Sequence, residues 1–366
     1  MGDRRKFLKG AAAGATAAGA LQAPAVHATP AELRWRLASS FPRSLDILFQ
    51  ASVAFARQVG ELTDNRFVIE VSAAGELVPG QQAADAVQSG VVEICHTLSH
   101  YYATKDPVFA LATSMPFGLN ARLQNAWWQE GGGANLVNSF LAGHKLYGLA
   151  AGNTGAGMGG WYRKEIAAIE DVGGLKMRSD GLGGEVLAEL GGVPNRIPFG
   201  TTYEALEKGI VDAAAWGCPY DDEKLALQKL AQVYHYPAWW AGGSMLHLFV
   251  NLERWQALPP PFQAALRGAA AQANANITAR YDARNPAALR RLAQAGASLK
   301  PFPEPVLDAF FSAANKVCED MGRSSESFRN IYQSQKAFRS DGYLWFQVAE
   351  SSFDTYMMIQ SRKRAL

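Results

Sequence analysis

Hydrophobic and polar positions near the start of the chain predict a strand, a helix and a second strand. Apolar residues at 33, 35 and 37 alternate with arginines, as in a half-buried strand, and residues 67–71 (FVIEV) form a second β-rich run. Between them, apolar residues over 48–62 fall at helical spacing behind Asp46, a candidate N-cap. Because a helix joining two strands in this way connects parallel strands, we expect parallel strands in the first sheet.

One unit of this pattern recurs about 119 residues further along the chain. Residues 86–93 (AVQSGVVE) and 205–212 (ALEKGIVD) each read as a helix end, a glycine stop and the start of a strand. Ligands of open α/β sheets bind beyond the carboxyl ends of strands, which places His96, Ala215 and Trp216 where two lobes would face each other. A chance likeness is the alternative, because such junctions are common.

The later part of the chain combines a glycine-rich stretch with helices. Residues 146–151 read as a strand that enters a stretch dense in glycine at 152–160. This density indicates close backbone approach, with a mobile surface loop as the alternative. From Pro261 onward the pattern predicts helices almost throughout, broken at Pro286 and at 301–305, and we expect them to brace the two lobes.

Length and composition favour a two-lobed globular protein. The 366 residues exceed what one hydrophobic core usually organises, and 48% hydrophobic against 19% charged residues allow large cores. The net charge of +2, with signs interspersed, removes the electrostatic reason to propose nucleic acid or an anionic membrane as partner. Cys95, Cys218 and Cys318 have no CxxC spacing, so neither a disulfide framework nor a zinc site is predicted.

The first 28 residues predict export. Residues 3–9 (DRRKFLK) are typical of a twin-arginine signal, a weakly apolar stretch follows at 10–21, and 24–28 (PAVHA) are typical of a cleavage site. We therefore expect a twin-arginine signal peptide over 1–28, a mature chain from about Thr29, and a periplasmic protein. A basic N-terminus is the alternative, whereas the apolar run is too short for a transmembrane anchor.

Nine short motifs follow one another along the chain. They are RLASSFP at 36–42, GELVPG at 75–80, CHT at 95–97, KDP at 105–107, PFGLNAR at 116–122, GNTG at 152–155, LKMR at 175–178, PYDDEK at 219–224 and PAWW at 237–240. In this order and spacing they resemble the periplasmic solute-binding proteins of TRAP (tripartite ATP-independent periplasmic) transporters, and within them the branch that binds 2-oxo acids. The resemblance implies two α/β lobes joined by crossing strands, a long bracing helix, and a ligand enclosed by hinge closure.

The same resemblance implies domain bounds and a function. Lobe I would comprise residues 29–152 and lobe II residues 153–242, each with part of 243–366. The chain would deliver a small organic carboxylate, a 2-oxo or related monocarboxylic acid, to a membrane permease without a cofactor, and a homodimer is left open. The alternative is an exported enzyme acting on a small organic acid. No GxSxG or HExxH motif supports it, and Cys95 and His96, as strand neighbours, would point to opposite faces.

The resemblance also assigns roles at the binding site. Arg178 takes the position of the carboxylate-binding arginine, and a planar guanidinium grips a carboxylate with two charge-assisted hydrogen bonds. Trp216 matches an aromatic wall residue and Asn153 a polar contact near the hinge. A core position is the alternative for His96, and His100 is expected on the surface of the same loop. The first-lobe segment that faces the ligand in relatives carries three candidates, His96, Tyr101 and Tyr102.

The chain departs from its relatives at three small residues. Gly157 and Ala215 stand where amide and acidic side chains hold a cation in those relatives, and Ala241 replaces an acidic residue nearby. A hard cation needs oxygen ligands, so we expect no sodium or calcium here. The small residues also predict a larger cavity and an acid bulkier than pyruvate. Asp180 is a candidate partner for a hydroxyl or amino group of that acid, with a solvated loop carboxylate as the alternative.

Overall fold

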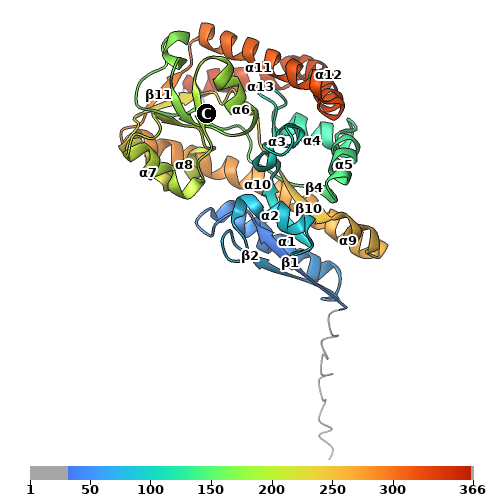
Figure 1. Ribbon diagram of the computed structural model, residues 1–366. Coiled ribbons are helices and arrows are strands. Elements are labelled where there is room, and N and C mark those ends of the chain that lie inside the picture. Colours follow the sequence, from blue (N-terminus) through green and yellow to red (C-terminus); the bar gives the residue numbers. More distant parts are fainter. Residues whose placement is uncertain (1–31, 364–366) are drawn as a thin grey trace, which may run out of the picture.

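The described part of the protein consists of two sheets with helices packed around them (Figure 1). A computed structural model describes residues 32–363, and the predicted signal peptide at 1–28 lies outside this range. Across 32–363, no helix has both the length and the apolar character that crossing a membrane would need. The predicted two-lobed α/β fold is confirmed, whereas the exact lobe bounds stay a prediction.

The first sheet has the strand order β2-β1-β3-β10-β4. β1 pairs in parallel with both β2 and β3, as predicted, whereas β10 runs antiparallel between β3 and β4. Since β10 follows the central strands of the second sheet in sequence, the chain crosses between the sheets after β4 and again before β10. The strands are β1 (Leu33–Ser39), β2 (Phe67–Ser72), β3 (Ile94–Leu98), β4 (Leu146–Asn153) and β10 (Met245–Asn251).

The second sheet has the order β11-β9-β5-β8-β6-β7. β6 pairs in parallel with β7 and β8, and β5 runs antiparallel to its neighbours β8 and β9. Because these strands are short, the loops in which the chain crosses between the two sheets lie close to the first sheet. The strands are β5 (Gly160–Tyr162), β6 (Lys176–Arg178), β7 (Val193–Asn195), β8 (Ala213–Ala214), β9 (Val233–Tyr236) and β11 (Ser298–Pro301).

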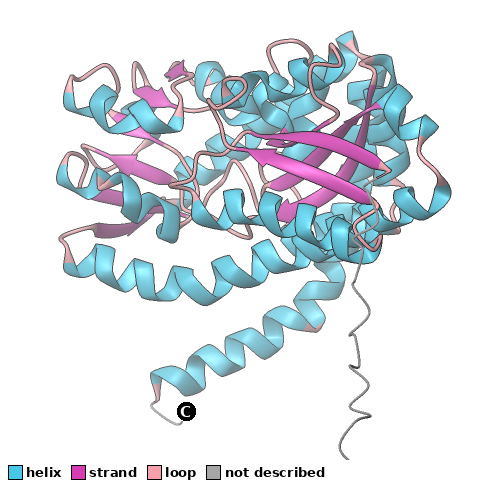
Figure 2. Cartoon of the chain, turned by 90° about the horizontal axis from the view of Figure 1, so that it is seen from below, coloured by secondary structure: helices cyan, strands magenta, loops and turns pink. Residues whose placement is uncertain are grey.

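Helices surround both sheets (Figure 2). Those packed with the first sheet are α1 (Asp46–Leu62), α2 (Ala83–Gln88), α3 (Val108–Thr113), α4 (Ala121–Gln129), α5 (Gly133–Gly143) and α9 (Leu252–Ala257). α10 (Pro260–Gln294) packs both on β4 of this sheet and on α8. The others are α6 (Gly181–Glu189), α7 (Thr202–Glu207), α8 (Pro219–Leu225), α11 (Glu304–Ser324), α12 (Glu326–Val348) and α13 (Glu350–Arg362). Short 3-10 helices join them, η1 (Gly80–Gln82), η2 (Ser99–Tyr102), η3 (Ile169–Val172), η4 (Phe199–Thr201) and η5 (Leu227–Lys229).

The repeated helix, glycine, strand unit is present in both lobes. α2 ends before Gly90 and leads to β3, and α7 ends before Gly209 and leads to β8. Both glycines have a positive φ, +76° and +68°, which a residue with a Cβ adopts only with strain. The two units also hold equivalent places, because β3 pairs in parallel with β1 and β8 with β6.

Helix α10 braces the two lobes, as predicted. Its Leu266 is buried in a core with the first sheet, and its Leu292 in a core with the second. The predicted break at Pro286 is wrong, because the helix continues through this proline to Gln294. A proline removes only one helical hydrogen bond, and the burial of Ala288 and Leu292 beyond it compensates for the loss.

Two local expectations from the sequence have different outcomes. The glycine-rich stretch is a place of close backbone approach and not a surface loop, because a Cβ on Gly160 would lie 2.8 Å from the carbonyl oxygen of Ala214. Asp46 is not the N-cap of α1. It is the first residue of the helix and makes no capping hydrogen bond, and its carboxylate instead contacts residues of α8 and α10.

Candidate functional site

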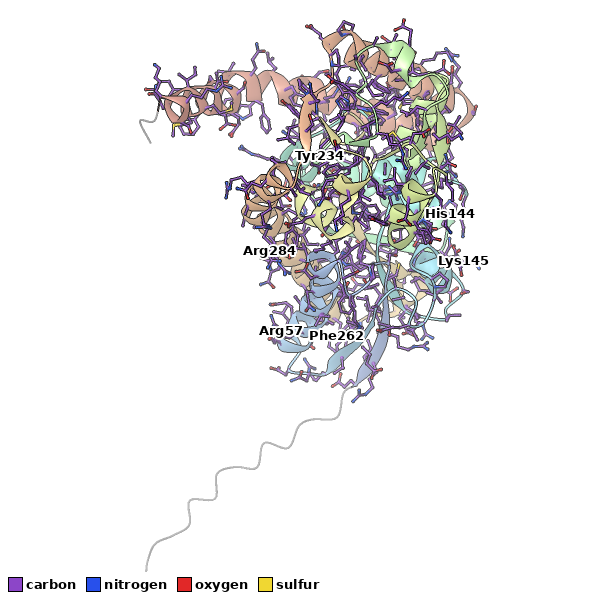
Figure 3. The ribbon with its side chains drawn as sticks, turned by 90° about the vertical axis from the view of Figure 1, so that its left-hand side faces the viewer. Arg57, His144, Lys145, Tyr234, Phe262 and Arg284 are labelled. Atoms are coloured by element: carbon purple, nitrogen blue, oxygen red, sulfur yellow. The ribbon has the colours of Figure 1, made fainter. Side chains whose placement is uncertain are left out.

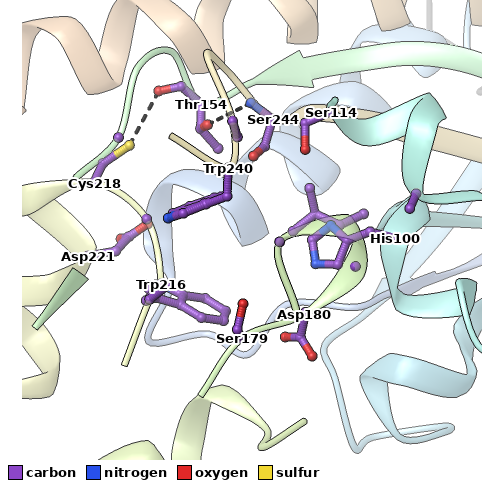
Figure 4. Close-up of a pocket in the computed structure, with 18 of the residues that line it drawn as sticks. His100, Ser114, Thr154, Ser179, Asp180, Trp216, Cys218, Asp221, Trp240 and Ser244 are labelled. Carbon is purple, nitrogen blue, oxygen red and sulfur yellow. Dashed lines mark hydrogen bonds between the residues drawn. The ribbon is translucent and has the colours of Figure 1, made fainter. Parts of the chain in front are cut away.

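A cavity lies between the two sheets where the loops of both lobes meet (Figure 4). The first lobe contributes η2, which follows the carboxyl end of β3, and the second contributes the residues after β6 and after β8. Both crossing segments, at 154–157 and 240–244, complete the wall. The cavity therefore occupies the place that the sequence predicted, beyond the carboxyl ends of strands. Its volume is about 70 Å³.

Arg178 ends β6 and forms part of the cavity wall. Its side chain is almost fully buried, and three groups of the second lobe orient it. Nε donates to the carbonyl oxygen of Ile197 at 3.0 Å and Nη1 to that of Ala215 at 2.7 Å, while Nη2 is bonded to the carboxylate of Asp180. A guanidinium has five N–H donors, so these contacts leave two for a ligand. The centre of the guanidinium also lies 4.8 Å from the ring centroid of Trp216.

Asp180 brings a negative charge to the same wall. Its carboxylate is largely buried and forms an ion pair with Arg178. The pair is nearly neutral as a unit, so an arriving carboxylate meets one cation and one anion together. The solvated position that the sequence left open for Asp180 is therefore wrong.

His100 faces this pair from the first lobe. Its ring lies at the cavity and packs against Tyr101, with centroids 4.8 Å apart. Burial lowers its pKa to about 4, with the nearby carboxylate of Asp180 opposing that shift. The imidazole is thus neutral at pH 7 and offers one donor and one acceptor. The expected surface position of His100 is wrong, although its place just past a strand end was a signal that sequence reasoning did not use.

The structure brings six of the nine predicted site residues to the cavity. They are Tyr101, Gly157, Arg178, Ala215, Trp216 and Ala241. The other three, His96, Tyr102 and Asn153, are buried away from it.

Each of these three side chains is already engaged within the protein. His96 lies 2.9 Å from the Ser52 hydroxyl and packs in the core of the first lobe. The Tyr102 hydroxyl accepts a hydrogen bond from a backbone N–H at 3.0 Å. Asn153 donates to Gln124 at 2.8 Å and accepts from the backbone N–H of Gly155 at 3.0 Å, so it shapes the start of the crossing segment.

At Gly157 the cavity is not enlarged as expected. A Cβ on Gly157 would lie 2.7 Å from the carbonyl oxygen of Gly217, so backbone occupies the space that a side chain would take. The indole of Trp240 lies across the cavity beside Ala241 (Figure 4).

The cavity offers few carboxylates to a cation. The carboxylates that line it belong to Asp180 and Asp221. Asp180 is paired with Arg178, and Asp221 accepts hydrogen bonds from Lys224 at 2.9 Å and from Tyr281 at 2.5 Å. Within residues 32–363, no group of three or more acidic, histidine or cysteine side chains is placed to hold a metal ion. The acidic side chains at the cavity therefore offer no free carboxylate to a sodium or calcium ion.

A cluster of charges connects the lobes beside the cavity. The carboxylate of Asp46 on α1 accepts hydrogen bonds from Lys224 at 2.5 Å and from the Tyr220 hydroxyl at 3.1 Å, both on α8. Arg284 of α10 donates to the same carboxylate at 2.9 Å and lies at the junction of the two halves of the molecule (Figure 3). Partial burial opposes ionisation of Asp46, but these partners, Lys224 first, lower its pKa.

Comparison with known proteins identifies relatives along almost the whole chain. The family model described as bacterial extracellular solute-binding protein, family 7, matches residues 38–325. The chain is 42% identical over 359 residues to a monocarboxylate 2-oxoacid-binding periplasmic protein of Nostoc sp., covering 96% of this chain and 98% of the relative.

Solved structures of similar proteins carry small acids. A TRAP transporter solute-binding protein from Bordetella bronchiseptica superposes with a TM-score of 0.89 at 42% identity, covering 92% of this chain and all of that one. It is a mixed-occupancy dimer with copurified calcium and picolinate in one active site. A TRAP periplasmic solute-binding protein from Pseudoalteromonas atlantica, with sodium and pyruvate bound, superposes with a TM-score of 0.85 at 32% identity, covering 88% of this chain and 98% of that one.

Proposed function

The chain belongs to family 7 of the bacterial extracellular solute-binding proteins, and we propose that its cavity captures a small 2-oxo acid or related monocarboxylate for a TRAP transporter. The observation that carries this proposal is the buried Arg178 in the cavity wall, held in place by two carbonyl groups and Asp180, with two of its five N–H donors not used in these bonds. Receptors of this family bind small carboxylates and work with membrane permease subunits. The chain is thus a receptor and not an enzyme.

The contacts around the cysteines agree with this reading. Cys95 is fully buried, and burial raises the pKa of its thiol, so it carries no thiolate at neutral pH. Cys218 lines the cavity, but burial raises its pKa as well and its thiol donates to the carbonyl of Thr154. Neither thiol is an activated nucleophile.

The proposal is tested by calorimetric titration of the purified protein with pyruvate, 2-oxobutanoate and picolinate. Arg178→Lys keeps the charge but loses the planar fork, so we expect affinity to fall at least about tenfold, and Arg178→Ala to abolish measurable binding. Arg196→Lys is the matched control, because Arg196 forms an exposed pair with Glu185 in the same lobe. Binding that survives in Arg178→Ala would overturn the proposal.

The size of the acid follows from the room in the cavity. A cavity of about 70 Å³ is small, and similar proteins hold pyruvate or picolinate, so we assign it an acid of about their size. In the same titrations, affinity should fall for acids with longer chains. Tightest binding of a long-chain acid would contradict this assignment.

We further propose that binding needs no inorganic cation. The support is the donor set: both carboxylates at the cavity are engaged with protein partners, and Gly157, Ala215 and Ala241 carry no oxygen in their side chains. Titration with pyruvate in the presence of EDTA, sodium or calcium should give the same affinity. An affinity that depends on one of these ions would refute the idea.

Location and assembly are proposed in the same way. The family is extracellular by description, and the sequence of residues 3–9 supports twin-arginine export to the periplasm. Replacing Arg4 and Arg5 by lysine should retain the protein in the cytoplasm in cell fractionation.

A homodimer is supported by α13, none of whose side chains is buried and which extends away from the body (Figure 3). Exposed apolar residues there and at the end of α12 include Trp345, Phe353 and Tyr356.

A further inference from the structure

The carboxylate of Asp180 uses only one of its two oxygens within the protein. Asp180 is the N-cap residue of α6, where an aspartate ordinarily accepts a hydrogen bond from the first turn of the helix, yet its side chain makes no capping bond. Its Oδ2 is bonded to Nη2 of Arg178 instead. Its Oδ1 makes no hydrogen bond to any residue within 32–363 and is not among the fully buried atoms that lack a partner, so it keeps accessible surface.

Asp180 lines the cavity between the lobes. Its side chain is 11% exposed and lies beside Ser179 in the cavity wall (Figure 4). His100 lines the same cavity from the first lobe, and a Cβ on Gly181 would lie 3.3 Å from the Cβ of His100, so the first lobe covers this wall closely. A molecule held in the cavity can therefore reach Oδ1.

The free oxygen of Asp180 needs a hydrogen-bond donor. A carboxylate only accepts hydrogen bonds, so the group that completes Oδ1 must carry an N–H or O–H. One free oxygen is too few for an inorganic cation, since calcium takes about six to eight oxygen ligands. When the carboxylate of an acid binds Arg178, which Oδ2 already holds, the substituent on carbon 2 of the acid is the first group that can reach Oδ1.

We infer that Asp180 is a specificity-determining residue, which selects acids that carry a hydroxyl on carbon 2. The inference rests on the proposed function and deepens it, because it names the class of monocarboxylate. The pyruvate anion has no N–H or O–H group, so in every orientation it leaves Oδ1 without a donor, whereas the hydroxyl of lactate supplies one. A ligand that leaves a polar group of the closed cavity unpaired binds more weakly.

A hydroxyl suits this wall better than an ammonium. An ammonium brings three donors and needs as many acceptors. The other carboxylate at the cavity, that of Asp221, already accepts hydrogen bonds from Lys224 at 2.9 Å and from Tyr281 at 2.5 Å. A hydroxyl needs only Oδ1 of Asp180. The site therefore favours a 2-hydroxy acid over a 2-amino acid of the same size.

The first test uses the wild type alone, in calorimetric titrations with lactate, pyruvate and 2-fluoropropanoate. 2-Fluoropropanoate keeps the tetrahedral carbon 2 of lactate and has no donor, so it separates hydrogen bonding from shape. We expect the better-bound enantiomer of lactate to bind at least about tenfold more tightly than either of the other acids. Equal binding of lactate and 2-fluoropropanoate would overturn the inference.

The second test replaces Asp180 by asparagine. The amide keeps an oxygen for Arg178 and can offer a donor to the ligand in place of Oδ1, so the preference for lactate over pyruvate should fall to about twofold or less. Glu185→Gln is the matched control, because Glu185 on the same helix forms an exposed pair with Arg196, and it should keep the preference of the wild type. Thermal unfolding of both variants checks that they fold. A preference for lactate that survives in Asp180→Asn would refute the role of Asp180.

The inference and the proposed function can fail separately. If the wild type binds pyruvate as tightly as lactate, the inference is wrong and the proposed function stands. If the wild type binds none of lactate, pyruvate and picolinate, the proposed function fails and the inference with it. Tighter binding of alanine than of lactate would overturn the assignment of a hydroxyl. If Asp180→Asn binds neither acid, the comparison of lactate with 2-fluoropropanoate in the wild type decides alone.

Discussion

Asp46 and Lys224 connect the two lobes directly, with 2.5 Å between a carboxylate oxygen at the start of α1 and the ammonium nitrogen on α8. Tyr220 and Arg284 bind the same carboxylate, so one side chain of the first lobe gathers partners from α8 and α10. These contacts join the two lobes beside the cavity. Because these contacts depend on charge, substitutions that remove a charge can test them.

Replacing Asp46 by asparagine should accelerate ligand release. The substitution removes the charge that attracts Lys224 and Arg284 across the lobes, and we expect pyruvate to dissociate about three- to tenfold faster in stopped-flow measurements, with a smaller change in the association rate. Glu61→Gln is the control, since Glu61 pairs with Arg57 on the exposed face of the same helix. An unchanged dissociation rate in Asp46→Asn would show that the cluster does not stabilise the closed form.

Replacing Asp180 by asparagine should strengthen the binding of pyruvate. The variant removes a negative charge beside the bound carboxylate, while Ile197 and Ala215 still orient Arg178, so affinity should rise several-fold. Lactate should gain less, because its hydroxyl can donate to the carboxylate of Asp180 in the wild type. Calorimetry with both acids measures the difference, with Glu185→Gln on α6 as the control. A loss of pyruvate binding would mean that Asp180 is needed to position Arg178.

Asp222 should make the folded protein less stable as the pH rises toward neutrality. Burial raises its pKa to about 7, with hydrogen bonds from Tyr234 and Trp161 opposing the shift. Its ordinary value is 3.8. The folded state therefore binds a proton that the unfolded state has released, and stability that is complete below pH 3.8 is lost progressively up to about pH 7.

The comparison of wild type with Asp222→Asn isolates this effect. Between pH 5 and pH 8, urea unfolding of the wild type should lose about 2 kcal/mol relative to the variant, whose amide does not titrate. Above pH 8 the difference should be constant. Parallel curves from pH 5 to pH 8 would show that the carboxyl of Asp222 is ionised throughout this range.

Deleting residues 350–366 should convert a dimer into a monomer. Phe353 and Tyr356, 65% and 60% exposed in a single chain, need a partner surface, and light scattering after size-exclusion chromatography gives the mass. Leu62→Asp is the control, because this exposed apolar residue lies alone at the end of α1. The deletion should leave pyruvate affinity unchanged, since α13 contributes nothing to the cavity. A wild type that elutes as a monomer would contradict the prediction.

Local sequence patterns predicted the strands and turns of the two sheets well, because these elements depend mainly on residues that are neighbours along the chain. The alternation at 33–37 and the repeated unit ending at Gly90 and Gly209 reappear as strands and turns in the predicted places. The site was predicted less completely. The motif around Arg178 indicated a carboxylate anchor, but its neutralisation by Asp180 depends on side-chain geometry within one loop.

Positions that depend on distant contacts were not predictable from the sequence. His100 was expected at the surface, and only the approach of the second lobe places its ring at the cavity. The contacts of Asp46 likewise depend on partners from α8 and α10. Contacts between the lobes depend on how distant segments pack together, and local sequence patterns carry no information about that packing.

The proline within α10 gives this helix a built-in flexure. Tyr281 is buried with residues of the first lobe, Leu292 with residues of the second, and Pro286 lies between them. Proline has no N–H to offer the carbonyl one turn earlier, so resistance to bending is lowest at this point. We therefore expect any relative movement of the two halves to bend this continuous helix most easily around residue 286.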